Sequence, residues 1–303
     1  MRSVILNLDG ALDDQTELRK TAVRNRGEIV FARDLGPALR LWSSAGTLNL
    51  LRRRLRARPP AGEPELVFAG SGDFHHVTPL LVERALQLAC EPVTILHFDN
   101  HPDWVRHARG RHCGSWVGYA ARMEGVAQVI TVGVCSPDVG RARARAGDLA
   151  LFAEKRLQLF AWAAPDGGDA VVLDGRSWPT IESLGEDAFL DQLDKAIAGS
   201  SLYVTIDKDV LRAQDAVTNW DQGQASLNFV LAAIRRACGG RRVIGADVVG
   251  DWSPADYGSG AAALLKWGEA RLDQPRRRPN PEVARTVNEA ANLRFLDLFA
   301  GRS

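Results

Sequence analysis

The sequence predicts an α/β protein in which helices cover both faces of a parallel sheet. Short apolar segments rich in Val, Ile and Leu alternate with longer amphipathic segments. Most of the short segments are apolar at consecutive positions, as strands buried on both faces are. The chain has 303 residues and a mass of 33.0 kDa, and no repeat or long linker divides it. We therefore expect one doubly wound α/β domain over residues 1–303.

Each element is predicted from its length and its apolar spacing. The strands are expected at 3–8, 66–69, 93–98, 127–133, 157–161, 170–173, 201–206 and 242–248. The helices are expected at about 40–57, 78–90, 114–124, 141–153, 186–198, 225–238, 258–270 and 281–299. The last helix has a clear start, because Asn280 can cap a helix whose first residue is Pro281.

The composition excludes several classes of protein. With 46% hydrophobic and 25% charged residues, the chain is of ordinary globular type. Its 38 Lys and Arg balance 37 Asp and Glu, so no net field attracts nucleic acid or an anionic membrane. The four cysteines form no C-x-x-C pair, and there is no signal-peptide pattern and no apolar run of membrane-spanning length. We expect a cytoplasmic protein with neither nucleic-acid nor membrane partners.

All the histidines lie in one short part of the chain. The six are His75, His76, His97, His101, His107 and His112. The segment GSGDFHH follows the predicted strand 66–69, and the segment HFDNHPDW includes the end of the predicted strand 93–98. In open α/β sheets ligands bind at the carboxyl ends of the strands. This window is therefore where we expect the chemistry.

Asp99, His101 and Asp103 follow the strand 93–98 at every second position. In extended chain such side chains project to the same side, about 6–7 Å apart. Pro102 stops regular strand pairing and so places them at the strand end. Two carboxylates beside an imidazole repel each other unless a cation lies among them. The spacing therefore predicts a hard divalent metal ion.

A second strand end repeats this pattern. Asp207 and Asp209 follow the strand 201–206 on one side, and Lys208 faces away. The candidate ligands are Asp99, His101, Asp103, Asp207, Asp209 and one of His75 and His76. Four carboxylates balance two divalent ions, and such an oxygen-rich set suits manganese or magnesium better than zinc. Two ions about 3.5–4 Å apart can lower the pKa of a shared water to near neutrality.

These segments, in this order, resemble the motifs of the arginase/agmatinase (ureohydrolase) family, whose fold is also that of the histone deacetylases. GSGDFHH, DNHPD and TIDKD are similar to the family's Gly-Gly-Asp-His, Asp-Ala-His-x-Asp and Ser-x-Asp-x-Asp. The resemblance implies a three-layer α/β/α domain with a mostly parallel sheet of about eight strands. It also implies two Mn²⁺ ions and attack by hydroxide on a guanidinium carbon, with release of urea.

The resemblance also assigns roles to residues. Five of the six ligand positions match directly; they are Asp99, His101, Asp103, Asp207 and Asp209. For the sixth, His75 is favoured over His76, and we expect the other histidine in the core or just outside the ligands. His112, in RHCGSW, matches a histidine near the mouth of the site that passes a proton to the leaving amine. The alternative for His112 is a surface histidine at a helix start.

The departures from the family pattern concern the substrate. Arg212 and Ala213 stand where the family has Asp-Pro. In GADVVGDWSP, Asp251 is the best match to the Glu that holds a guanidinium, if one residue is inserted; otherwise Gly250 takes that place. The loop TNWDQG supplies three candidate substrate-binding residues, which otherwise simply close the loop; they are Asn219, Trp220 and Asp221. The family loop that holds an amino acid's carboxylate has no clear match, so L-arginine is not implied.

Three functions remain open on the sequence alone. The first is a manganese-dependent hydrolase of a cationic guanidino or related amidine compound, working as a homo-oligomer as relatives often do. The second is a deacetylase-like amide hydrolase with a single zinc, which the complete D-x-H-x-D set argues against. The third is a catalytically silent relative that binds metal and acts as an interaction protein.

Overall fold

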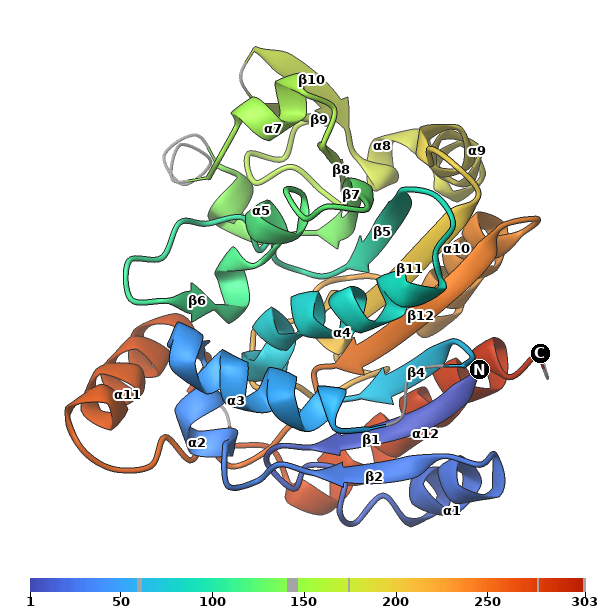
Figure 1. Ribbon diagram of the computed structural model, residues 1–303. Coiled ribbons are helices and arrows are strands. Elements are labelled where there is room, and N and C mark those ends of the chain that lie inside the picture. The colour runs from blue at the N-terminus through green and yellow to red at the C-terminus, as the bar shows by residue number, and fades with distance from the viewer. Residues whose placement is uncertain (59–61, 141–146, 174, 277, 302–303) are drawn as a thin grey trace.

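The computed structural model describes residues 1–58, 62–140, 147–173, 175–276 and 278–301. At its centre is a sheet of eight strands, all parallel, in the order β2-β1-β4-β12-β11-β5-β7-β8 (Figure 1). The strands are β1 (Arg2–Asn7), β2 (Glu28–Phe31), β4 (Glu65–Phe68), β5 (Val93–Phe98), β7 (Val126–Val134), β8 (Leu157–Ala161), β11 (Ser201–Asp207) and β12 (Arg242–Val249). The predicted fold class is confirmed.

The strand composition of the sheet differs from the prediction at one place. The segment 170–173 is a strand, β9 (Ala170–Leu173), but it pairs antiparallel with β10 (Arg176–Pro179) outside the main sheet. The eighth strand of the sheet is β2, which was not predicted. β2 is a four-residue edge strand with a single buried position, so its sequence carries only a weak apolar signal.

Helices cover both faces of the sheet (Figure 1). On one face lie α3 (Ala45–Arg56), α4 (Thr78–Ala85) and α5 (Val117–Ala120), and on the other α1 (Thr16–Arg24), α9 (Glu186–Ala196), α10 (Leu227–Cys238) and α12 (Pro281–Phe299). The remaining helices are α2 (Gly36–Leu39), α7 (Ala150–Ala153), α8 (Ile181–Leu184) and α11 (Ala261–Asp273).

Several predicted helices are shorter than expected. The helix predicted at 40–57 begins at Ala45, because the Ser44 side chain accepts from the Thr47 amide and so caps it. The residues just before it form β3 (Trp42–Ser43), which pairs with β6 (Arg111–His112). The helix predicted at 114–124 is reduced to α5. Of the segment 141–153, residues 141–146 lie outside the described residues.

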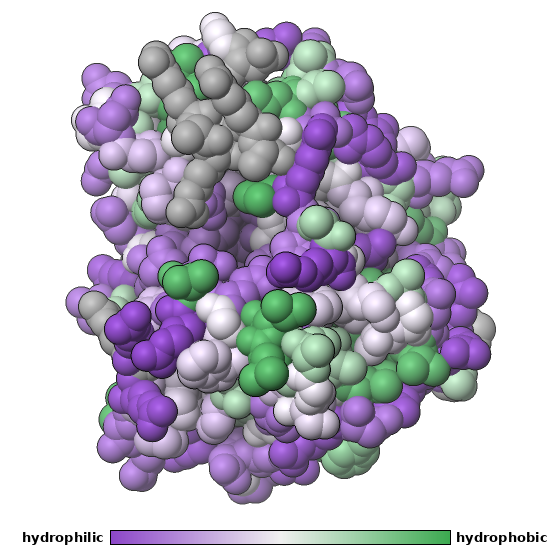
Figure 2. Space-filling model, turned by 90° about the vertical axis from the view of Figure 1, so that its left-hand side faces the viewer, coloured by the Kyte–Doolittle hydropathy of each residue, from purple (hydrophilic) through white to green (hydrophobic). Residues whose placement is uncertain are grey.

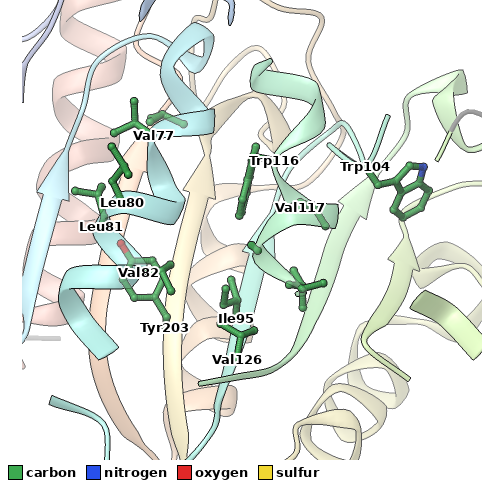
Figure 3. Packing of buried hydrophobic residues seen from close by; sticks show 14 of the residues in the cluster. Val77, Leu80, Leu81, Val82, Ile95, Trp104, Trp116, Val117, Val126 and Tyr203 are labelled. Atoms are coloured by element: carbon green, nitrogen blue, oxygen red, sulfur yellow. The ribbon is translucent and has the colours of Figure 1, made fainter. Parts of the chain in front are cut away.

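The apolar residues form one core on each face of the sheet. Along β5, Ile95 packs with the layer of α4 and α5, whereas Leu96 and Phe98 pack with the helices of the opposite face. Figure 3 shows the first core, in which Val82 of α4, Ile95 of β5 and Tyr203 of β11 lie together. In the described residues, no helix combines the length and the apolarity needed to cross a membrane.

The register of the two central strands positions the candidate ligands. β5 and β11 are parallel neighbours, and Phe98 is paired with Ile206. The next residue of each strand, Asp99 and Asp207, therefore reaches the carboxyl edge of the sheet at the same level. A 3₁₀ turn (Gly72–Val77) follows β4 at the same edge and brings His75 to this place.

Candidate metal centre

The first group of candidate ligands surrounds His75, which is buried. Its Nδ1 atom lies 3.0 Å from Oδ2 of Asp99, 3.2 Å from Oδ2 of Asp103 and 3.6 Å from Oδ2 of Asp207. The three carboxylates come from the ends of β5 and β11, as predicted for a shared site. One imidazole nitrogen and three carboxylate oxygens thus face one small volume.

The second group is built on His101. Its Nδ1 lies 2.9 Å from Oδ2 of Asp209 and 3.5 Å from Oδ1 of Asp99. Asp99 therefore offers Oδ2 to the first group and Oδ1 to the second. A carboxylate shared in this way places two cation sites side by side.

The hydrogen bonds around Thr205 show that Nε2 of His75 carries a proton. The Thr205 hydroxyl donates to Oδ1 of Asp247 at 2.8 Å, so its oxygen accepts from Nε2–H of His75 at 3.0 Å. Although burial would lower the pKa of His75, contacts with Asp103 and Asp99 raise it well above its ordinary value, so without a metal Nδ1 carries a proton as well. Nδ1 is buried, and no described residue gives it a hydrogen bond of acceptable geometry. A proton or a metal ion must lie between Nδ1 and the carboxylate oxygens, and the convergence of these donors on one volume fits a metal ion.

Two further buried side chains orient the carboxylates, and the sequence reasoning did not single them out. Nε2 of His97 lies 2.9 Å from Oδ2 of Asp99, and Nε1–H of Trp116 donates to Oδ2 of Asp103 at 2.7 Å. Burial lowers the pKa of His97 to about 4, so this ring is neutral. His97 lies two residues before Asp99 on the same strand, and this spacing was the available signal.

Without a metal, the carboxyl groups of the site differ in protonation, and Asp103 holds a proton at neutral pH whereas Asp207 is largely ionised. Burial, together with the negative charge of Asp99, raises the pKa of Asp103 to about 8 and that of Asp207 to about 6. A divalent cation would take the place of these protons. The electrostatics of the group therefore favour a bound cation over an empty cluster of charges.

Asp103 reaches the site in a different way from the one predicted. The strand β5 ends at Phe98, and Asp103 has a φ of 49°, in the left-handed region. Its side chain therefore joins Asp99 through a turn and not through the alternation of an extended strand. A non-glycine residue in this region carries strain of about 1 kcal/mol or more, of the kind that functional sites retain.

His76 does not join the cluster. It is fully buried, and neither ring nitrogen has a hydrogen-bond partner among the described residues. Burial lowers the pKa of His76 well below its ordinary value. Of the two histidines in GSGDFHH, the structure thus places only His75 against the carboxylates, and His76 is a core residue.

Asp251 corrects a further expectation, because it does not face the cavity. It is 1% exposed, lies 2.8 Å from Nζ of Lys208, and accepts from Nε2 of Gln15 at 2.6 Å. Gly250 offers no alternative. Its φ is +92°, and a Cβ there would lie 2.5 Å from Oδ1 of Asp207. Neither alignment of this segment therefore provides a carboxylate for a substrate.

A cavity of about 580 Å³ opens over the strand ends, and its lining includes Asp99, His101, Asp103, Asp207 and Asp209. Figure 2 views the face that carries β6 and α11, where a hollow opens among hydrophilic side chains. Trp220 and Asp221 line the cavity, and Oδ1 of Asp221 lies 3.0 Å from Nε2 of His101.

Asn219 has a different place from its two neighbours. It bonds to the backbone of Ser253 through both ends of its amide and accepts from the Ser71 hydroxyl. It is absent from the described lining of the cavity. The structure therefore gives Asn219 the part of closing the loop, which was the alternative to binding substrate.

His112 lines the cavity together with two residues that were not predicted, His107 and Glu269. Nδ1 of His112 accepts from the Gly114 amide at 2.9 Å, and Nδ1 of His107 accepts from the Arg109 amide at 3.3 Å. The Nε2–H groups of both rings therefore point to Oε1 of Glu269, at 3.5 and 3.0 Å. Glu269 lies on α11, far along the chain and outside any motif.

The two Nε2–H groups of His107 and His112 suit the carboxylate of Glu269 between them and not another metal ion. A metal would need the Nε2 lone pairs, yet a neutral imidazole has only one, which here faces a backbone amide at Nδ1. Nε1–H of Trp42 donates to Oε2 of Glu269 at 2.8 Å. Although burial alone would raise the pKa of Glu269, the contacts with His107 and His112 bring it below its ordinary value. Burial lowers the pKa of His112 to about 4, so its ring is neutral at pH 7.

The fold is that of the arginases and agmatinases. The chain is similar to a hypothetical agmatinase from Burkholderia thailandensis, with a TM-score of 0.59, 16% identity, and coverage of 99% of this chain and 86% of that one. For arginase from Bacillus cereus the TM-score is 0.57, with 16% identity over 96% and 97% of the two chains. For formimidoylglutamase from Bacillus subtilis subsp. subtilis str. 168 it is 0.54, with 11% identity over 95% and 86%.

Similarity in sequence is weak. No protein-family model matches the chain. An uncharacterized protein of Thermotoga maritima is 23% identical over 192 residues, which are 63% of this chain and 60% of that protein. The matched region thus spans less than two thirds of the relative's length.

Proposed function

We propose that the protein is a metal-dependent hydrolase that cleaves a C–N bond of a cationic guanidino or related amidine compound and releases urea or a related product. The observation that carries this proposal is the pair of ligand groups joined by Asp99. Each group supplies one imidazole and several carboxylate oxygens, a donor set that suits Mn²⁺. When bound, a pair of divalent ions activates water for attack on an electrophilic carbon.

The charge of the cavity supports a cationic substrate. Four carboxylates that are not candidate ligands line it: Asp138, Asp221, Glu269 and Asp273. No lysine or arginine occurs in its lining within the described ranges. Glu269 lines the cavity and is held there by Trp42 at Oε2 and by His107 at Oε1. Glu269, and not Asp251, would therefore attract and orient the positively charged group of the substrate.

His112 remains a proposed proton carrier on account of its place in the cavity. Its ring is neutral at the start of a reaction cycle, and it would take up a proton from the attacking water at Nδ1 by releasing the Gly114 amide, while Nε2–H faces the cavity. Oε1 of Glu269 lies 3.5 Å from Nε2 of His112 and would offset the positive charge of the protonated ring. The proton then passes to the leaving amine.

The substrate class, the homo-oligomer, the cytoplasmic location and the absence of nucleic-acid and membrane partners stay predictions. A silent relative remains the second candidate, since neither Gly250 nor Asp251 supplies the carboxylate that guanidine-cleaving relatives carry. The deacetylase-like alternative requires a single metal, against which the second group around His101 argues.

The test combines metal content with a screen for turnover. The protein is loaded with Mn²⁺, the ions per chain are counted, and urea and ammonia release are measured over a set of guanidino and amidine compounds. Asp209→Asn serves as the matched inactive control. Two ions with product release support the proposal. One zinc with deacetylation supports the second reaction, and two ions without any turnover support the silent relative.

A further inference from the structure

Trp220 lines the cavity over the candidate metal centre and is only partly buried, against a small apolar cluster that includes Trp42 and Cys113. Its indole ring lies 5.6 Å from the imidazole of His101, measured between the ring centroids, and the two planes are inclined at 67°. The next residue, Asp221, lies with Oδ1 3.0 Å from Nε2 of the same imidazole. The indole and the second group of candidate ligands thus border the same part of the cavity.

A single buried carboxylate holds the edge of this indole. Nε1–H of Trp220 donates to Oδ1 of Asp73 at 3.0 Å, and the side-chain amide of Gln274 donates to the same oxygen at 2.6 Å. Oδ2 of Asp73 accepts from Nη1 of Arg40 at 2.7 Å, and both of these side chains are at most 1% exposed. Three donors from distant segments of the chain thus converge on Asp73.

Asp73 joins two walls of the cavity without being part of either, since it is absent from the described lining. Trp220 belongs to the loop between β11 and α10, and Gln274 follows the last residue of α11, the helix that carries Glu269. Unlike the candidate ligands, Asp73 has a permanent counter-charge in Arg40, so it needs no metal ion. Its place therefore suits the support of the cavity walls and not contact with a substrate.

The face of an indole attracts cations, and tryptophan is the most effective aromatic side chain in this respect. Donation of the N–H group to a carboxylate polarises the ring and makes its face more negative. The described lining of the cavity contains no lysine or arginine that would compete for Trp220. A cation that enters the cavity thus meets an aromatic ring as well as carboxylates, whereas an uncharged group gains little from the charge distribution of the ring.

We propose that Trp220 determines the preference of the site for a cationic over an uncharged group, and that Asp73 is a positioning residue that holds the indole in place. Asp73 acts through Trp220 and does not touch the substrate. The inference rests on the proposed function for the location of the cationic group at the metal centre. It adds the residue that distinguishes a guanidinium substrate from the uncharged urea that the reaction would release.

The experiment measures binding by titration calorimetry on the manganese-loaded protein, with no need for turnover. The probes are n-butylguanidinium and n-butylurea, which have nearly the same shape and differ in charge. The wild-type protein should bind the guanidinium more tightly than the urea. Trp220→Leu keeps an apolar side chain against the cluster but removes the aromatic face, so it should reduce this preference by about 2- to 30-fold and leave the Mn²⁺ content unchanged.

The matched control is Trp267→Leu. Trp267 is also a tryptophan with exposed surface, at 55%, but it lies on α11 outside the described lining of the cavity. Its replacement should leave the affinities for both probes as they are in the wild-type protein.

A cycle of variants tests whether Asp73 acts through the indole. Asp73→Asn should reduce the preference for n-butylguanidinium by about 2- to 10-fold when Trp220 is present. The same replacement should have almost no effect in Trp220→Phe, which keeps an aromatic ring but has no N–H group to donate. If Asp73→Asn does not fold, Trp220→Phe alone remains informative, because it should lose part of the preference.

Equal preferences of the wild-type protein and Trp220→Leu would overturn the selection by Trp220. Equal losses from Asp73→Asn with and without the indole N–H, or a wild-type preference in Trp220→Phe, would overturn the positioning role of Asp73. Failure of the proposed function gives a different result: n-butylguanidinium binds in a manner that depends on Trp220, but no guanidino or amidine compound is cleaved.

Discussion

The ends of β11 and β12 are neighbours in the sheet, yet their carboxylates have opposite surroundings. Asp251, just after β12, is paired with Lys208 and accepts from Gln15. Asp207 and Asp209, at the end of β11, face other carboxylates and the imidazoles of His75 and His101. Although burial would lower the pKa of both imidazoles, contacts with the carboxylates of the site raise it well above the ordinary value. A buried charge that a lysine neutralises permanently is structural, whereas a buried cluster that is balanced only by exchangeable protons on imidazoles and carboxyl groups can exchange them for a cation from outside.

Removal of the structural carboxylate should have the largest effect on stability. In Asp251→Ala, Lys208 stays buried without its counter-charge, so we expect a loss of about 3–5 kcal/mol in the free energy of unfolding. Urea denaturation measures this loss, and the Mn²⁺ content of the folded variant should not change. The double variant Asp251→Leu/Lys208→Met should recover much of the stability. Loss of metal in Asp251→Ala would remove the contrast between the two strand ends.

Removal of a candidate ligand should lower metal binding and leave stability unchanged, the opposite of the result expected for Asp251→Ala. Asp209→Ala and Asp103→Ala should lose one ion each, with a fall in metal affinity greater than the roughly 100-fold that a supporting residue costs. The metal-free variants should be no less stable than the metal-free parent, because the raised pKa of each removed carboxyl group shows that the site does not stabilise its charge. Retention of both ions, measured by elemental analysis, would show that these carboxylates are not ligands.

A smaller effect should follow from the hydrogen bond that orients His75. Thr205→Val removes the acceptor for Nε2–H and frees the ring to change its tautomer, so metal affinity should fall by about 10- to 100-fold. Thr94→Val is the matched control, because this buried threonine donates to the backbone of Ala198 and contacts no candidate ligand. Equal metal affinities of the two variants would mean that the tautomer of His75 is not set in this way.

The smallest effect is a dependence on pH. The pKa of Asp103, about 8, lies above the unfolded value of 3.8, so between about pH 6.5 and 8 the folded metal-free protein keeps a proton that the unfolded chain has lost. Its stability should therefore fall as the pH rises over this range, and the metal-loaded protein should not show this fall. At lower pH the neutral rings of His97 and His112, with pKa values of about 4, oppose the effect of Asp207. Mn²⁺ binding should release protons, which calorimetry in buffers of different ionisation enthalpy detects. Metal binding without proton release below pH 8 would contradict the raised pKa of Asp103.

The part of the site that was predictable lies on consecutive residues after strands. DNHPD and TIDKD each follow an apolar strand, and the pairing of β5 with β11 brings their carboxylates together as expected. His75 and His76 could not be separated by sequence, because the choice depends on the 3₁₀ turn that follows β4. Asp251 follows a strand, as Asp207 does, and was expected to hold a guanidinium. Its partners Gln15 and Asn292 come from distant parts of the chain.

Other features depend on contacts between distant segments and carry no local signal. Glu269 meets His107 across 162 positions of sequence, through the packing of α11 against the loop before β6. The edge strand β2 was missed because a half-exposed strand of four residues has little apolar pattern. The left-handed conformation of Asp103 depends on the turn around Pro102 and not on residue type. Tertiary packing, which local propensity does not include, determines all three.

The most direct measurement is a crystal of the protein soaked in Mn²⁺, with anomalous diffraction recorded at the manganese edge. We predict two anomalous peaks, one in contact with His75, Asp99 and Asp103, and the other in contact with His101, Asp209 and the second oxygen of Asp99. No peak between the ends of β5 and β11, or carboxylates there that turn away from each other to solvent, would contradict the assignment of this cluster as a binuclear metal centre.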